Sequence, residues 1–132
     1  MSETPEHGTW DDVFGAADPR LAEIAGAARA AIKRRHPGAV EVARPGERSV
    51  SFGLGAAKMS EAYAYLTAQR AWVNLGFFQG TALPDPAGLM EGTGDRLRHV
   101  KLRDAAEIEN PALVDLIDAA IAERARALGR EV

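Results

Sequence analysis

The sequence predicts an α+β fold: an antiparallel sheet of about five strands, with helices from both ends of the chain packed on it. Two segments, one near each end, repeat apolar residues at helical spacing. Five shorter segments between them have the alternation or the aromatic content of strands, and "RPGE" between the first two is typical of a hairpin turn. Consecutive strands with helices outside them indicate an α+β layer.

Length and composition are consistent with one domain. The chain has 132 residues, of which 46% are hydrophobic and 27% are charged, and a chain of this size can bury a core of its own. We expect residues 1–8, which are polar and acidic, to form a frayed tail, and residues 9–132 to form a single domain.

Each predicted helix is preceded by residues that typically cap a helix N-terminus. Thr9 and Asp12 have the spacing of a capping box, and Asp18-Pro19 begins a longer helix that Pro37-Gly38 ends. The apolar stripe of this helix is Leu21, Ile24, Ala28 and Ile32. Asn110-Pro111 repeats the device, and the final helix has the stripe Leu113, Ile117, Ile121 and Leu128 before Gly129.

Strands are expected between these helices. The hairpin places Val40 and Val42 on one strand and Val50 and Phe52 on the next. The other three strands are expected within residues 62–66, 71–78 and 98–102, with Val100 and Leu102 facing inward. Asp85-Pro86 is a third pair of the helix-starting kind, so a one-turn helix is predicted through Met90, with Asp85 as a cap rather than a catalyst.

A long stretch resembles a known family. "VNLGFFQGTALPDPAGLMEGTGDRLRHVKLR", from Val73 to Arg103, together with "KMSEAYAYL" and the final helix, is similar to the YdhG-like domain family, whose members are mostly of unknown function. The resemblance implies an α+β fold similar to frataxin, and for some relatives a role as iron chaperones. It implies no catalytic residue.

Two features of the sequence, one residue and the charge of one helix, depart from what the resemblance implies. Asp95 stands where the family pattern leads us to expect lysine. The first long helix carries Glu23, but it also carries Arg20, Arg29, Lys33, Arg34 and Arg35, whereas iron binding in frataxin is associated with an acid-rich first helix.

The sequence contains no recognisable motif for catalysis, metal binding or cofactor binding. There is no cysteine, and His7, His36 and His99 lack the spacing of a metal site. "GLGAAK" and "GTGD" do not match phosphate-binding loops, and no GxSxG surrounds a serine. We therefore expect no enzyme, no metal and no cofactor.

A surface is the remaining candidate site. Alternation would place Tyr63 and Tyr65 on one side of their strand, and Trp72, Asn74 and Phe78 on one side of the next. It would place His99, Lys101 and Arg103 on one side of the last strand. If the helices cover the opposite side, six residues could bind a small planar or anionic ligand: Tyr63, Tyr65, Trp72, Asn74, His99 and Lys101.

The functional prediction is therefore a non-catalytic binding module for a small ligand or a protein partner, with a homodimer as one possibility. An intracellular iron chaperone and an enzyme with a non-local active site are the alternatives. The net charge of −3 favours neither nucleic acid nor membrane as a partner, and the N-terminus lacks the basic and apolar parts of a signal peptide. A cytoplasmic protein is expected.

Overall fold

The computed structural model describes residues 8–132, so nearly all of the expected N-terminal tail lies outside the described residues. A short helix α1 (Trp10–Phe14) precedes the long helix α2 (Pro19–Arg35). The strands are β1 (Val40–Arg44), β2 (Ser49–Gly53), β3 (Ala62–Ala68), β4 (Val73–Phe77) and β5 (Arg98–Leu102). Helix α3 (Pro111–Leu128) is the last element, and short 3-10 turns occur at η2 (Pro45–Glu47), η3 (Gly80–Ala82) and η4 (Ala105–Glu109).

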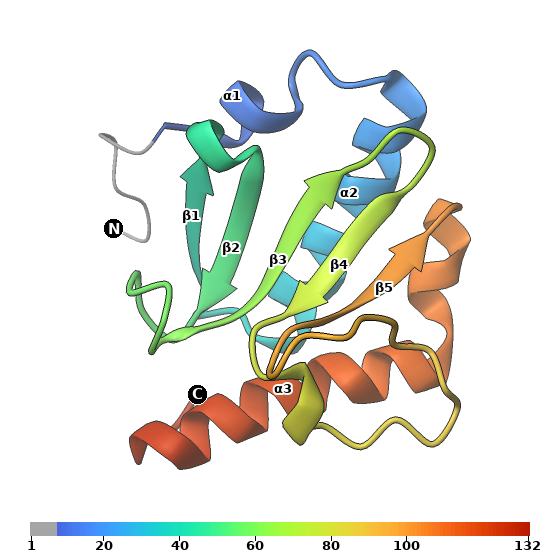
Figure 1. The fold of residues 1–132 in the computed structure, drawn as a ribbon. Coiled ribbons are helices and arrows are strands. Elements are labelled where there is room, and N and C mark those ends of the chain that lie inside the picture. The colour runs from blue at the N-terminus through green and yellow to red at the C-terminus, as the bar shows by residue number, and fades with distance from the viewer. Residues whose placement is uncertain (1–7) are drawn as a thin grey trace.

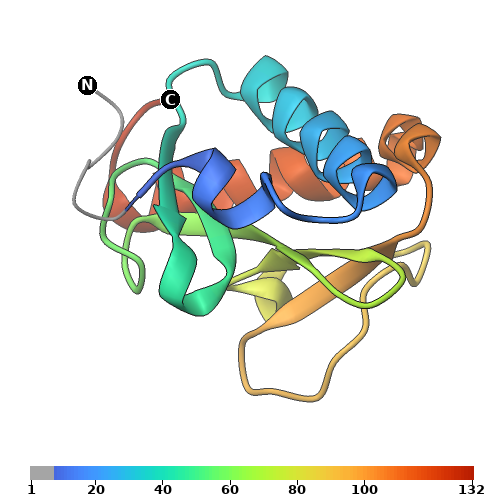
Figure 2. The ribbon, with the colours of Figure 1, turned by 90° about the horizontal axis from the view of Figure 1, so that it is seen from above.

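The five strands form one sheet in sequence order, and each strand pairs with the next in antiparallel register (Figure 1). Helices α2 and α3 lie on one side of this sheet (Figure 2). This arrangement confirms the α+β class and the antiparallel sheet predicted from the sequence. It leaves the other side of the sheet, hereafter the open face, without either long helix.

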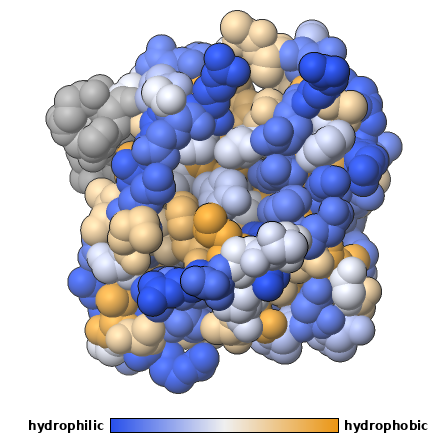
Figure 3. Space-filling view, viewed as in Figure 1, coloured by the Kyte–Doolittle hydropathy of each residue, from blue (hydrophilic) through white to orange (hydrophobic). Residues whose placement is uncertain are grey.

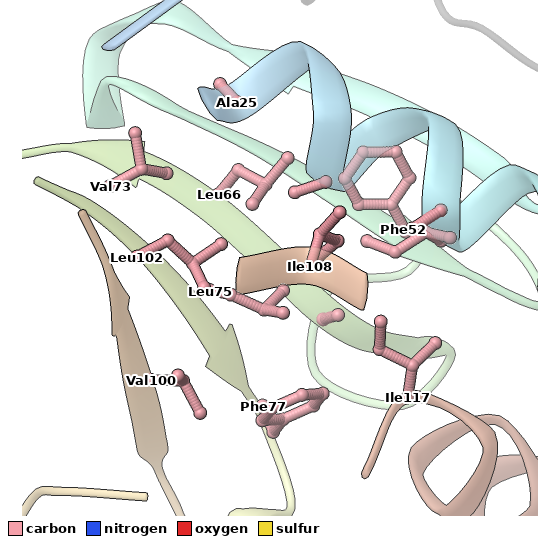
Figure 4. Packing of buried hydrophobic residues seen from close by; sticks show 14 of the residues in the cluster. Ala25, Phe52, Leu66, Val73, Leu75, Phe77, Val100, Leu102, Ile108 and Ile117 are labelled. Carbon is pink, nitrogen blue, oxygen red and sulfur yellow. The ribbon is translucent and has the colours of Figure 1, made fainter. Parts of the chain in front are cut away.

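The hydrophobic core fills the space between the sheet and the helices. Figure 4 shows Phe52, Leu66 and Leu75 pointing from neighbouring strands toward Ile108 and Ile117 on the helical side. The predicted helical stripes face this core, since Leu21, Ile24, Ala28, Ile32, Leu113, Ile117 and Ile121 are all buried. Leu128, the last residue of the second predicted stripe, is only half-buried. Val100 and Leu102 of β5 also face inward, as expected.

The helix starts are those that the sequence predicts. The Asp18 carboxylate accepts a hydrogen bond from the Arg20 amide at 2.8 Å, and the Asn110 side chain accepts one from the Ala112 amide at 3.0 Å. Thr9 and Asp12 form the expected capping box before α1. These caps satisfy backbone donors that the first helical turn leaves unpaired.

Asp85 is a cap, but the predicted one-turn helix after it is wrong. Residues 86–87 form a turn in which the Gly88 amide donates to the Asp85 carbonyl at 3.0 Å. Gly88 has φ +67°, a backbone conformation that glycine adopts without strain and that ends any helical path. The Asp85 carboxylate accepts from the amides of Leu89 and Met90, both at 2.9 Å, and so holds the loop in shape.

Within residues 8–132, no helix has both the length and the apolar character that crossing a membrane requires.

Candidate functional site

The open face carries polar and aromatic side chains in rows across the sheet. Residues directly paired in an antiparallel sheet point to the same side, so the register defines each row. One row contains Arg44, Ser49, Thr67, Asn74 and Lys101, and the next contains Val42, Ser51, Tyr65, Gly76 and His99. Trp72 and Phe78 flank β4 with the same alternation, so the predicted set of Tyr65, Trp72, Asn74, His99 and Lys101 does share this face.

Tyr63 does not lie on the open face, and that expectation is wrong. The register shifts between Phe52 and Gly53, which pair with Ala64 and Ala62, so Tyr63 between them has no partner and forms a bulge. Its side chain is buried in the core, where its hydroxyl lies 2.7 Å from Nδ1 of His36 at the end of α2. Burial raises the pKa of Tyr63 and lowers the pKa of His36.

Tyr65 forms an aromatic floor at the centre of the open face. Its side chain lies across Gly76 of β4, since a Cβ atom built on Gly76 would overlap two carbons of the ring and the hydroxyl oxygen. The ring of Phe78 packs beside it with centroids 5.1 Å apart. Burial raises the pKa of Tyr65, so its hydroxyl is protonated and can donate a hydrogen bond.

The loop between β2 and β3 forms one wall over this floor. Lys58 of the loop makes an ion pair with Glu47 of η2 at 2.6 Å, and the Arg44 side chain donates to the Ala56 carbonyl at 3.1 Å. The far end of the loop is tied to α3, where Arg124 donates to the Ser60 carbonyl at 2.7 Å. These contacts hold the loop against the sheet from two sides.

A hollow of about 220 Å³ lies between this wall and the loop before β5. We call it the hollow; its lining residues are Glu47, Ser49, Lys58, Tyr65, Thr67, Phe78 and Leu97. A second depression of similar volume shares Lys58, Phe78 and Leu97 and adds Met59, Gln79 and Arg96. Figure 3 looks onto this face and shows its middle hollowed between hydrophilic side chains.

The rim of the hollow exposes apolar surface. Met59 is 74% exposed and Leu97 is 47% exposed, although both are large hydrophobic residues. They come from the two loops that border the second depression. Exposed apolar side chains beside a concave surface are typical of ligand or partner contacts.

A second cluster occupies the β4–β5 half of the open face. The Trp72 indole N–H donates to the Asn74 side-chain oxygen at 2.8 Å. The Lys101 ammonium lies 4.7 Å and the Arg103 guanidinium 5.4 Å from the centre of the Trp72 ring. Lys101 also lies 3.3 Å from the Glu91 carboxylate. The sequence grouped three of these residues correctly, but Arg103 was not among the predicted site residues.

His99 has a different role at this edge. Its backbone exchanges two hydrogen bonds with Glu91, at 2.8 and 3.0 Å, which covers part of the outer edge of β5. Its side chain is half-buried and does not line the hollow.

The geometry of the hollow does not bear on the iron-chaperone and enzyme alternatives. In the described part of the chain, no group of three or more His, Asp or Glu side chains is placed to hold a metal ion. His36, whose pKa is shifted by burial, lies in the core against Tyr63 rather than in the hollow. The iron-chaperone and enzyme alternatives stay predictions.

Sequence reasoning missed most residues of the hollow. Phe78 was visible, because it alternates with Trp72 and Asn74 along β4. Ser49 and Thr67 occupy strand positions where hydroxyl side chains are common and carry no signal. Lys58 and Leu97 belong to loops, whose path over the sheet is fixed by tertiary contacts rather than by local pattern.

Comparisons of the chain with protein-family models, with curated proteins and with solved structures gave no match. The resemblance to the YdhG-like family therefore stays a prediction.

Proposed function

We propose that the protein is a non-catalytic module that binds a small ligand in the hollow of the open face. The observation that carries the proposal is the seating of Tyr65 on Gly76. Because Gly76 has no side chain, the Tyr65 side chain can lie across it, which leaves an aromatic surface at the floor of a mostly apolar concavity.

The lining suits a ligand with a flat ring. Tyr65 and Phe78 offer ring contacts, for which offset or tilted stacking is favourable by about 0.5–1.5 kcal/mol beyond the buried area. Ser49 and Thr67 place hydroxyl groups on the same floor, and the Tyr65 hydroxyl adds a donor. A mostly apolar pocket with a few polar groups that fix orientation is the usual form of a small-molecule site.

The cost of binding is reduced by preorganisation. The Lys58–Glu47 pair and the Arg124–Ser60 contact hold the wall in place by contacts within the protein. A ligand entering the hollow therefore does not have to order this loop, and less of its contact energy is lost as conformational entropy.

A fragment screen by saturation-transfer NMR, using small aromatic and heteroaromatic compounds, tests the proposal. Hits are expected to lose at least half of their saturation signal in Tyr65→Leu, which keeps apolar bulk but removes the planar floor. The control is Trp10→Leu, which removes a ring on α1 that packs against Arg29 of α2 and does not line the hollow. Equal signals in Tyr65→Leu and the parent, or loss only in Trp10→Leu, would contradict the proposal.

A further inference from the structure

The cluster around Trp72 presents hydrogen-bond donors toward the solvent beside the hollow. An indole N–H can only donate, so the contact of 2.8 Å with Asn74 requires the amide oxygen of Asn74 to face Trp72. The two N–H donors of that amide are consequently turned away from the ring. No described residue accepts a hydrogen bond from them.

Two cations share the same aromatic ring. Lys101 and Arg103 lie 4.7 and 5.4 Å from the Trp72 ring centre, so both positive charges lie beside the same ring. The Lys101 side chain is only 26% exposed, so water screens it less than it screens an ordinary surface lysine. Glu91 is its carboxylate partner at 3.3 Å, and no carboxylate in residues 8–132 pairs with the Arg103 side chain.

We propose that Trp72, Asn74, Lys101 and Arg103 form a subsite for a carboxylate or phosphate group, and that the ligand of the hollow is a planar anion. The inference rests on the proposed function for the ring part of the ligand. The chemistry follows from the groups that remain free to donate. The Asn74 oxygen is occupied by Trp72, so its NH2 group is left as a donor. An ammonium and a guanidinium only donate, and a guanidinium matches the paired oxygens of a carboxylate or phosphate.

The sheet register places the subsite within reach of the hollow. Thr67 of the hollow pairs directly with Asn74, and Asn74 pairs directly with Lys101. Neighbouring strands are about 4.8 Å apart, so the cluster begins one strand away from the hollow and Lys101 lies two strands away, about 10 Å. An aryl or heteroaryl carboxylate or phosphate ester can span this distance.

The experiment uses the fluorescence of Trp72. The chain has two tryptophans, so Trp10→Phe leaves Trp72 as the only reporter. Inorganic phosphate, phenyl phosphate and benzyl alcohol are titrated into this variant at low ionic strength. We expect both phosphates to change the emission of Trp72, with phenyl phosphate binding more tightly than inorganic phosphate because its ring also contacts the hollow.

Charge-removing variants then assign the subsite. Lys101→Gln and Arg103→Gln are each expected to weaken phosphate binding about 10-fold, since a hydrogen bond to a charged group contributes about 1.5 kcal/mol or more. Arg34→Gln is the matched control, because Arg34 is an exposed arginine on the helical side, and it is expected to change the affinity less than twofold. Circular dichroism confirms that each variant is folded.

The two proposals fail in different ways. If phosphate leaves Trp72 unchanged, or binds Lys101→Gln and Arg103→Gln as well as it binds the parent, the anion subsite is wrong. If phosphate binds as expected but phenyl phosphate gains nothing over it and benzyl alcohol does not bind, the anion subsite stands and the hollow is not the site of the ring.

Discussion

Replacing Gly76 with alanine tests the floor of the hollow directly. The added Cβ would lie within 3.0 Å of three atoms of the Tyr65 side chain, two ring carbons and the hydroxyl oxygen, a separation that real Cβ atoms essentially never show. The Tyr65 ring has to move away from Gly76, because β4 is paired with β3 and β5 on its two sides and Gly76 cannot shift. We expect Gly76→Ala to lower the free energy of unfolding and to abolish fragment binding in the hollow.

The magnitude follows from two opposing effects. Overpacking of this kind typically costs about 1–3 kcal/mol. Loss of glycine from the unfolded chain stabilises by about 0.4–1 kcal/mol where the native conformation tolerates a side chain, and Gly76 has no positive φ that would forbid one. The net expectation is a loss of about 1–2 kcal/mol in the otherwise unchanged protein.

A double-mutant cycle separates the two effects. In a Tyr65→Ala background there is no ring to displace, so Gly76→Ala should be neutral or slightly stabilising. Urea unfolding of the four proteins should therefore give a coupling of about 2 kcal/mol between the two positions. A coupling near zero, with fragment binding retained in Gly76→Ala, would refute the placement of Tyr65 on Gly76.

Three further predictions concern the framework that positions the site. Burial lowers the pKa of His36 in the folded protein, so the unfolded state binds more protons below about pH 6.5. The contribution of His36 to the free energy of unfolding should therefore be constant above about pH 6.5 and fall as the pH drops below it. Urea unfolding of the parent and of His36→Gln at pH 7.5 and 5.5 measures this difference. A parent and variant with the same pH dependence would contradict it. Glu41 is 3% exposed, and its carboxylate accepts hydrogen bonds from Arg29 at 2.7 and 2.8 Å. Glu41→Gln should therefore lower the free energy of unfolding by about 2 kcal/mol, measured by thermal unfolding. A loss below about 0.5 kcal/mol, the size expected of an exposed ion pair, would count against a structural role. Asp85→Ala removes the acceptor of the Leu89 and Met90 amides and should lower the free energy of unfolding by about 1–2 kcal/mol. Hydrogen exchange at those two amides should become faster. Unchanged exchange would show that the carboxylate does not hold the loop.

Local patterns predicted the elements well where one physical rule acts alone. The stripes of α2 and α3 follow from helical spacing, and their starts follow from an Asx side chain placed before proline. The alternation of Trp72, Asn74 and Phe78 placed these three residues on one side of β4 because that strand is regular over its length.

The failures occur where a tertiary constraint replaces the local rule. Alternation would have kept Tyr63 with Tyr65, but a bulge opposite Phe52 and Gly53 turns the Tyr63 side chain into the core. Asp85-Pro86 has the signal of a helix start, yet Gly88 takes a left-handed conformation and the carboxylate caps a loop instead.

The hollow itself could not be predicted from the sequence. Its floor depends on a ring from β3 lying across a glycine of β4, which is a contact between strands rather than a feature of either one. Its wall depends on ion pairs and hydrogen bonds that link the β2–β3 loop to η2 and α3.

Chemical-shift mapping of the ¹⁵N-labelled protein with phenyl phosphate locates the bound ring and the bound anion in one experiment. We expect the amides with the largest shifts to be those of Ser49, Tyr65, Thr67 and Phe78 around the hollow and of Lys101 beside Trp72. Shifts confined to the groove between Pro84–Ala87 and the start of α3, where a depression of about 190 Å³ also exists, would contradict it.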